Sequence, residues 1–124
     1  ARACSLIKGI EFSEEGPILI SSLIKEEMGG MDVSVLMGAN VANEAARDEF
    51  CESTVGFATP ANGAVWQELF DCPTFKVSSI QDVSGVELCG ALKNVVALGA
   101  GFCDGLGLGG NTKAAIIRIG LAET

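Results

Sequence analysis

Short apolar segments alternate with segments of helical spacing over the first two-thirds of the chain, and this alternation constrains the fold more than any other feature. The apolar segments with strand character are residues 3–10, 33–37, 53–57 and 75–80. Helical patterns lie between them at residues 18–28, 41–50 and 60–70. Strands that alternate with helices are typical of an α/β fold. Each connection is long enough for a parallel crossover, and antiparallel pairs stay open for the later strands.

The pattern changes near Asp82. From there the sequence is helical in character to its end, interrupted only by the glycine-rich residues 99–110. Asn111 is expected to cap a last helix over residues 112–121 through its side-chain oxygen. The sequence therefore predicts an α/β domain over residues 1–81 and a helical domain over residues 82–124. We also expect the chain to be an internal piece of a longer protein.

Charge and composition argue against several classes of partner. The formal net charge is -8 and no cluster of lysines or arginines occurs. We therefore expect neither nucleic acid nor an anionic membrane surface as a partner, because both need a basic footprint. No apolar run is expected to be long enough to span a bilayer. The five cysteines are scattered and form no CxxC pair, so they predict free thiols in a reducing compartment and no metal site.

Lys8 and Asn40 are the first candidate site residues. Lys8 closes the first predicted strand, and the segment Gly38-Ala39-Asn40 follows the second. Ligands of open α/β sheets bind beyond the carboxyl ends of the strands, so the two segments are expected to share one crevice. Two simpler interpretations stay open. Lys8 can be a solvated lysine at a strand end, and Asn40 can be the N-cap of the helix over residues 41–50.

Lys93 is the second candidate. The chain contains no histidine and no tyrosine, so a proton-transfer group must be a lysine, a carboxylate or a thiol. Lys93 stands in an apolar run, and helical spacing places it on one face with the small residues Gly90 and Ala97. The opposite face, with Val95 and Phe102, is expected to pack into the core. A helix–helix contact with a lysine at its edge is an equal alternative to a site.

Three glycines after this helix, Gly105, Gly107 and Gly110, match the dinucleotide-binding pattern GxGxxG. That pattern carries its meaning only directly after a strand, and here a helical segment precedes it. The glycines therefore predict a sharp connection between two helices.

Residues 90–111, GALKNVVALGAGFCDGLGLGGN, resemble the signature of NAD-dependent glycerol-3-phosphate dehydrogenases, in which Lys-Asn is followed by spaced glycines, Asp-Gly and Gly-x-Asn. The resemblance extends to SLIKG around Lys8, to SVLMGANVANE at residues 34–44 and to NTKAAIIRIGL at residues 111–121. It implies that residues 1–81 are the second half of a Rossmann-like NAD-binding domain. Residues 82–124 are then the first helices of an all-α substrate domain.

The resemblance also implies an activity and a set of roles. Such enzymes interconvert dihydroxyacetone phosphate and sn-glycerol 3-phosphate with NADH and NAD, and a cytoplasmic homodimer is expected. By resemblance, Lys93 is the catalytic acid/base, Lys8 and Asn94 bind the substrate, and Ala42 and Asn40 bind NAD. The family's amino-terminal GxGxxG fingerprint and its later substrate-site residues are absent from the chain. We therefore expect the isolated chain to be inactive.

Two other functions stay open. Dehydrogenases of the 6-phosphogluconate or β-hydroxyacid type also place a lysine on the first interdomain helix, but the Asp-Gly and Gly-x-Asn elements after Lys93 argue against them. The second is an acidic interaction module that keeps only the fold, and the presence of both Lys8 and Lys93 argues against it.

Overall fold

The computed structural model describes all residues, Ala1–Thr124, and divides into two compact units. The first unit is Ala1–Gly90 and the second is Ala91–Thr124. Every strand belongs to the first unit, whereas the second is helical.

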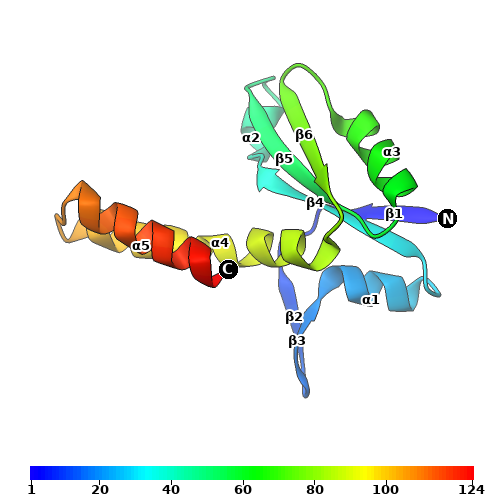
Figure 1. The fold of residues 1–124 in the computed structure, drawn as a ribbon, viewed down its shortest axis with the longest axis horizontal. Helices are drawn as coiled ribbons and strands as arrows, with labels where there is room; N and C mark the ends of the chain where they lie inside the picture. Colours follow the sequence, from blue (N-terminus) through cyan, green and yellow to red (C-terminus); the bar gives the residue numbers. More distant parts are fainter. The chain divides into compact units, whose positions relative to one another are not determined.

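A four-stranded sheet organises the first unit. Its strands lie in the order β1 (Arg2–Ser5), β4 (Asp32–Ala39), β5 (Cys51–Gly56) and β6 (Phe75–Ile80) (Figure 1). β1 pairs with β4 and β5 pairs with β6 in parallel, whereas β4 and β5 are antiparallel. The α/β fold class is therefore confirmed. The antiparallel pair is an arrangement that the sequence leaves open.

The core of this unit lies between the sheet and α3 (Pro60–Phe70). Leu36, Val55 and Val77 come from three neighbouring strands and are buried. Trp66 of α3 packs against them. Burial of each such aliphatic side chain stabilises the fold by roughly 1.5–3 kcal/mol. All five residues of the VSVLM segment of β4 are buried, as expected for a central strand covered on both faces.

The helices of this unit follow local signals in the sequence. α3 has the predicted bounds, with Pro60 at its first turn, where the missing N–H of proline costs nothing. α1 (Ile20–Glu27) lies within the predicted helix over residues 18–28. Gly29 and Gly30 end it with φ angles of 66° and 85°, which glycine adopts without strain.

The prediction for the helix after β4 is wrong in length and in its cap. The sequence predicts a helix over residues 41–50, but α2 covers only Ala42–Ala45. Asp48 has a φ angle of 57°, which turns the backbone out of the helical path before β5 begins. The N-cap position belongs to Val41 and makes no side-chain cap hydrogen bond, so Asn40 is not the cap.

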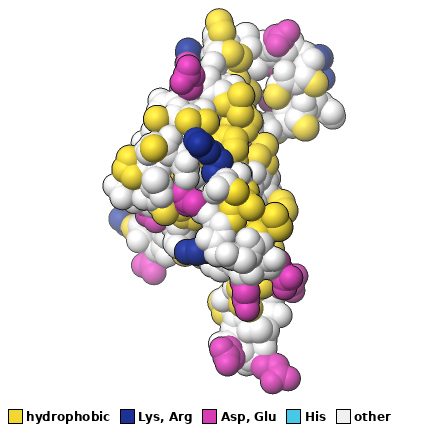
Figure 2. All heavy atoms as spheres, turned by 90° about the vertical axis from the view of Figure 1, so that its right-hand side faces the viewer, with side chains coloured by type: hydrophobic (Ala, Val, Ile, Leu, Met, Phe, Trp, Pro, Cys, Tyr) yellow, Lys and Arg dark blue, Asp and Glu magenta, His cyan; other side chains and the backbone are white.

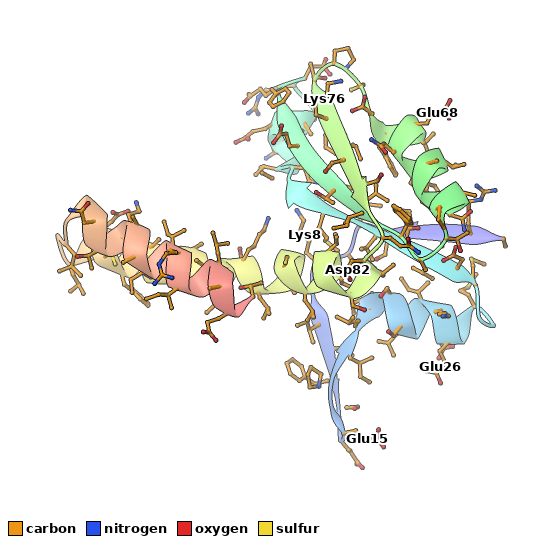
Figure 3. The ribbon with its side chains drawn as sticks, in the orientation of Figure 1. Lys8, Glu15, Glu26, Glu68, Lys76 and Asp82 are labelled. Carbon is orange, nitrogen blue, oxygen red and sulfur yellow. The ribbon has the colours of Figure 1, made fainter.

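A β-hairpin of β2 (Ile10–Ser13) and β3 (Gly16–Leu19) was not expected. The predicted strand over residues 3–10 is therefore wrong at its end, since β1 stops at Ser5. The sequence pattern does not predict this hairpin, because most of β2 is exposed and shows no buried alternation. Glu15 lies in its turn, and acidic side chains mark this end of the unit (Figures 2 and 3).

The second unit is a pair of helices. α4 (Val83–Gly105) starts in the first unit and continues through the second, and α5 (Gly110–Glu123) lies against it (Figure 1). A Cβ atom at Gly120 would lie 2.6 Å from Cγ2 of Val96. The two helices therefore approach more closely than a larger residue at that position allows.

The connection between these helices differs from the prediction. The sequence predicts a break over residues 99–110, but α4 remains helical to Gly105 and only residues 106–109 connect the helices. Gly107, with a φ angle of 66°, makes the turn. Gly109 is the N-cap of α5, so the expected capping role of Asn111 is wrong.

Two further expectations for α4 need correction. Val95 and Phe102, expected in the core, are 68% and 66% exposed. The second concerns membrane spans, because no apolar run is expected to be long enough for one. α4 contains an 18-residue stretch of mean hydropathy 1.4, which is long and apolar enough to cross a bilayer by length and composition. A single helix of this kind is weak evidence for a span, because core helices of soluble proteins have the same properties.

The first turn of α4 is fixed by Asp82. The Asp82 carboxylate accepts a hydrogen bond from the Gly85 N–H at 2.8 Å, so it acts as the N-cap (labelled in Figure 3). A Cβ atom at Gly85 would lie 2.2 Å from Oδ2 of Asp82. Glycine at this position therefore lets the carboxylate close over the helix start.

A buried carboxylate joins α4 to α1. Glu87 is 0% exposed and accepts two hydrogen bonds from Ser21, one from its backbone N–H at 3.0 Å and one from its hydroxyl. Ser21 is the second residue of α1, whose N-cap, Leu19, offers no side-chain acceptor. Glu87 thus supplies, from a distant helix, the acceptor that the first turn of α1 lacks. It does so at the helix end where the dipole favours negative charge.

We predict that Glu87→Ala lowers the free energy of unfolding by about 2–3 kcal/mol, because it leaves the buried donors of Ser21 without their acceptor. Urea unfolding of the full-length protein measures the loss, and hydrogen exchange at the Ser21 amide locates it. Glu26→Ala removes an exposed carboxylate from α1 itself and should change the stability by less than about 0.5 kcal/mol. Equal stability of both variants, with unchanged exchange at Ser21, would contradict the capping role.

Candidate functional site

Lys8 lies in the loop that follows β1, and its side chain reaches the end of β4. Its Nζ atom donates a hydrogen bond to Oδ1 of Asn40 at 2.6 Å and another to the backbone oxygen of Gly38 at 3.4 Å. Figure 3 shows the labelled side chain near this edge of the sheet. Two segments 32 residues apart in the sequence are therefore joined by one ammonium group.

The pairing of the strands explains this meeting. β1 and β4 are parallel, so their carboxyl ends lie at the same edge of the sheet. Their last paired residues are Ser5 and Val35. Continuing that register by three residues places Lys8 level with Gly38, which is the residue whose carbonyl it contacts. The sequence predicts that these two segments share one crevice, and the structure brings Lys8 and Asn40 into contact.

Asn40 is anchored on its other side by β5. Its Nδ2 atom donates a hydrogen bond to the Ser53 hydroxyl at 3.0 Å. Ser53 is 5% exposed and is paired with Gly38 in the antiparallel register of β4 and β5. A Cβ atom at Gly38 would lie 2.5 Å from Cα of Ser53 and 2.7 Å from its Oγ atom. Glycine at position 38 is therefore required for this close approach.

The sequence pattern does not identify Ser53. A serine within a strand is an ordinary residue, and the antiparallel register that brings it to Asn40 cannot be read from the sequence. The one available signal is a small polar residue at a position that the strand pattern assigns to the core.

Ala42 is the first residue of α2 and is exposed. It follows Asn40 by two residues, so it belongs to the same edge of the sheet. Its role in cofactor binding stays a prediction.

Lys93 and Asn94 lie on α4 within the second compact unit, and both are exposed. The predicted helix around them is present. Ala97, expected on the same face as Lys93, is exposed as well. Their roles in substrate binding and proton transfer stay predictions.

A hollow of about 410 Å³ lies beside the Lys8–Asn40 contact, on the part of the sheet formed by β4, β5 and β6. Gly38 and Ser53 line it, but neither Lys8 nor Asn40 does. Of its three charged residues, Glu52, Asp71 and Lys76, the last two pair with each other at 3.3 Å. The hydrogen bond from the Val77 N–H, together with Lys76, lowers the pKa of the Asp71 carboxyl. The lysine of the hollow is thus paired with a carboxylate, and the candidate residues predicted from the sequence lie outside it, so we place the candidate site at Lys8 and Asn40.

All five cysteines are free thiols, as their scattered spacing predicts. Burial raises the pKa of Cys4 to about 11, so this thiol is protonated at neutral pH. A hydrogen bond with the Thr74 hydroxyl lowers the pKa of the exposed Cys72. No group of three or more His, Cys, Asp and Glu side chains is placed to hold a metal ion.

Two family models match the chain. The model of the NAD-dependent glycerol-3-phosphate dehydrogenase N-terminus matches residues 1–62, and the model of the C-terminus of the same family matches residues 82–124.

Individual relatives agree with these models. The chain is 58% identical over 123 residues to the glycerol-3-phosphate dehydrogenase 1-like protein of Danio rerio. It is 55% identical over 123 residues to the cytoplasmic glycerol-3-phosphate dehydrogenase [NAD(+)] of Homo sapiens. Each alignment covers 99% of this chain and 35% of the relative, so the chain spans about a third of the length of the curated relatives it matches.

Solved structures lead to the same family. The Plasmodium falciparum glycerol-3-phosphate dehydrogenase superposes with a TM-score of 0.92 at 41% identity, covering 99% of this chain and 34% of that one. The Saccharomyces cerevisiae enzyme superposes with a TM-score of 0.89 at 46% identity, covering 98% of this chain and 37% of that one. In sequence, in fold and in the SLIKG, GAN and GALKN segments on which the resemblance depends, the chain belongs to the family of NAD-dependent glycerol-3-phosphate dehydrogenases.

Proposed function

We propose that the full-length protein carrying this chain interconverts dihydroxyacetone phosphate and sn-glycerol 3-phosphate with NADH and NAD. Membership of the family supports the reaction class. The observation that carries the proposal to particular residues is the hydrogen bond between Lys8 and Asn40, because it holds an ammonium group where an α/β sheet binds its ligands.

Lys93 is the proposed acid/base. NADH, when bound, supplies the hydride that converts the ketone into an alcohol. The ketone oxygen then gains negative charge and needs a cation and a proton beside it. Nζ of Lys93 gives its proton to that oxygen in the direction of reduction, and takes it back from the hydroxyl in the direction of oxidation. The neighbouring Asn94 is assigned to the substrate, for which its amide offers both a donor and an acceptor.

Lys8 is the second cation that we propose for the reaction. A phosphorylated substrate carries negative charge away from the reacting carbon, and an ammonium held by neutral acceptors attracts that charge. Asn40 and the Gly38 carbonyl are such neutral partners. Lys8 therefore binds the phosphate or the developing oxyanion.

Ala42 and Asn40 are the residues of this chain proposed to face NAD. The exposed methyl group of Ala42 fits a planar group lying against it. Asn40 joins the two parts of the site, because it stands two residues before Ala42 and holds Lys8 through its amide oxygen. A wrong placement of this asparagine would thus disturb substrate and cofactor together.

The setting of the enzyme is proposed from its relatives and its charge. Relatives of Homo sapiens and Rattus norvegicus are named cytoplasmic, and we assign this protein to the cytoplasm. A homodimer follows from the family resemblance. We expect no nucleic-acid or membrane partner, because a net charge of -8 repels the phosphates of both.

The reaction is tested by following the absorbance of NADH after addition of dihydroxyacetone phosphate to the full-length protein. We expect NADH oxidation that reverses with glycerol 3-phosphate and NAD. Oxidation of 6-phosphogluconate or a β-hydroxy acid in place of glycerol 3-phosphate would assign the protein to another dehydrogenase type.

We predict that Lys93→Ala lowers kcat by about two or more orders of magnitude, because the acid/base group is lost. Lys93→Arg should fall nearly as far, since an arginine keeps the charge but does not release its proton. The control is Lys25→Ala, which removes an exposed lysine of α1 and should leave kcat unchanged. Steady-state kinetics measure the three variants. Near-normal turnover of a folded Lys93→Ala protein would exclude the role.

A separate prediction concerns Lys8. Lys8→Met keeps the length of the side chain but removes its charge, so it should raise KM for dihydroxyacetone phosphate or lower kcat. The Kd of NADH, measured by fluorescence titration, should change little. Lys25→Met is the matched control and should alter neither constant. If NADH binding is lost while substrate binding persists, Lys8 belongs to the cofactor site instead.

A further inference from the structure

Ser53 makes a contact for which the proposed reaction has no direct use. Its hydroxyl accepts the hydrogen bond of Asn40 Nδ2 at 3.0 Å, on the side of the amide opposite to Lys8. The three side chains therefore form a line from the β1–β2 loop, across the end of β4, to the middle of β5.

The direction of the hydrogen bonds in this line is determined by chemistry. A lysine ammonium only donates, so Asn40 must turn its oxygen toward Lys8 and its NH₂ group toward the other partner. A serine hydroxyl accepts as readily as it donates, and it therefore satisfies the NH₂ group in this orientation. The reverse orientation of the amide would bring its NH₂ group against the ammonium.

The Ser53 hydroxyl is held more firmly than the other two groups. Lys8 is exposed in a loop, whereas Ser53 is 5% exposed on a strand paired on both sides. Gly38 lies opposite Ser53 in the register, and any Cβ atom there would collide with Cα and Oγ of Ser53. The sheet therefore fixes the backbone from which the hydroxyl projects. A group on a rigid element can hold a more mobile side chain in one geometry.

We propose that Ser53 is a positioning residue, which fixes the Asn40 amide and through it the Lys8 ammonium for the substrate. The proposal rests on the function proposed above for Lys8. Ser53 itself does not touch the substrate. Its effect passes through Asn40, and this distinguishes it from a residue that only stabilises the sheet.

The test compares Ser53→Ala, Asn40→Ala and the double variant in the full-length enzyme. Ser53→Ala should raise KM for dihydroxyacetone phosphate about five- to tenfold, the scale of one lost hydrogen bond, with a smaller change in kcat. In the Asn40→Ala background, the same Ser53 substitution should have no further effect on KM, because the group through which it acts is gone.

Thr54→Val is the matched control. It removes a hydroxyl from the next residue of β5, whose Oγ1 atom pairs with the Ser78 hydroxyl at 3.1 Å and not with Asn40. This variant should leave KM unchanged. A rise in KM for Thr54→Val equal to that of Ser53→Ala would mean that any weakening of the strand suffices, and would overturn the proposal.

A second readout does not depend on the reaction. A short pulse of acetic anhydride labels lysines, and mass spectrometry gives the rate at Lys8 relative to Lys25. Ser53→Ala should raise this relative rate several-fold, because the Asn40 amide that accepts the hydrogen bond of Lys8 is no longer anchored, and Thr54→Val should not. A faster rate at Lys8 with an unchanged KM supports the line of contacts while rejecting Lys8 as a substrate residue.

Two results overturn the positioning role itself. The first is an unchanged labelling rate at Lys8 together with an unchanged KM in Ser53→Ala. The second is a set of KM changes for Ser53→Ala and Asn40→Ala that multiply in the double variant, since independent effects exclude action through Asn40.

Discussion

Parallel pairing of β1 with β4 is the constraint on which the candidate site depends. It places the loop after Ser5 beside the last residues of β4, and the shared register brings Lys8 level with Gly38. An antiparallel pair would have sent that loop to the opposite edge of the sheet. β5 pairs with β4 in the antiparallel direction, and its register sets Ser53 directly opposite Gly38. The parallel pairing of β4 thus brings Lys8 to Asn40, and its antiparallel pairing brings Ser53 to the same residue.

Much of this arrangement follows from local signals. Pro60 at the start of α3 and the two glycines after α1 each determine a helix end within the chain's own neighbourhood, so these ends are predictable from the sequence. The buried run of β4 is also predictable from its own neighbourhood, since five consecutive core residues are typical of a strand covered on both faces. Lys8 and Asn40 are identifiable from the sequence because each follows a predicted strand.

The remainder depends on contacts between distant residues. Asn40 has the residue type and the position of a helix N-cap. Its amide instead accepts a hydrogen bond from the Lys8 ammonium and donates one to the Ser53 hydroxyl, and it does not cap α2. Ser53 has no signal of its own until the register of β4 and β5 is known. The hairpin after Lys8 is unpredictable for a different reason, because most of β2 is exposed and it lacks the buried alternation that marks a strand. Val95 and Phe102 show the same limit on α4, where helical spacing gives a face but not what covers it.

The acceptors of Lys8 matter because the chain is acidic. The chain carries a formal charge of -8, which opposes the approach of any anionic substrate. Asn40 and the Gly38 carbonyl hold the ammonium with neutral oxygens, and Ser53 holds Asn40 with another. Both of these acceptors of Lys8 are neutral oxygens, so neither of them opposes the approach of an anion to the ammonium group.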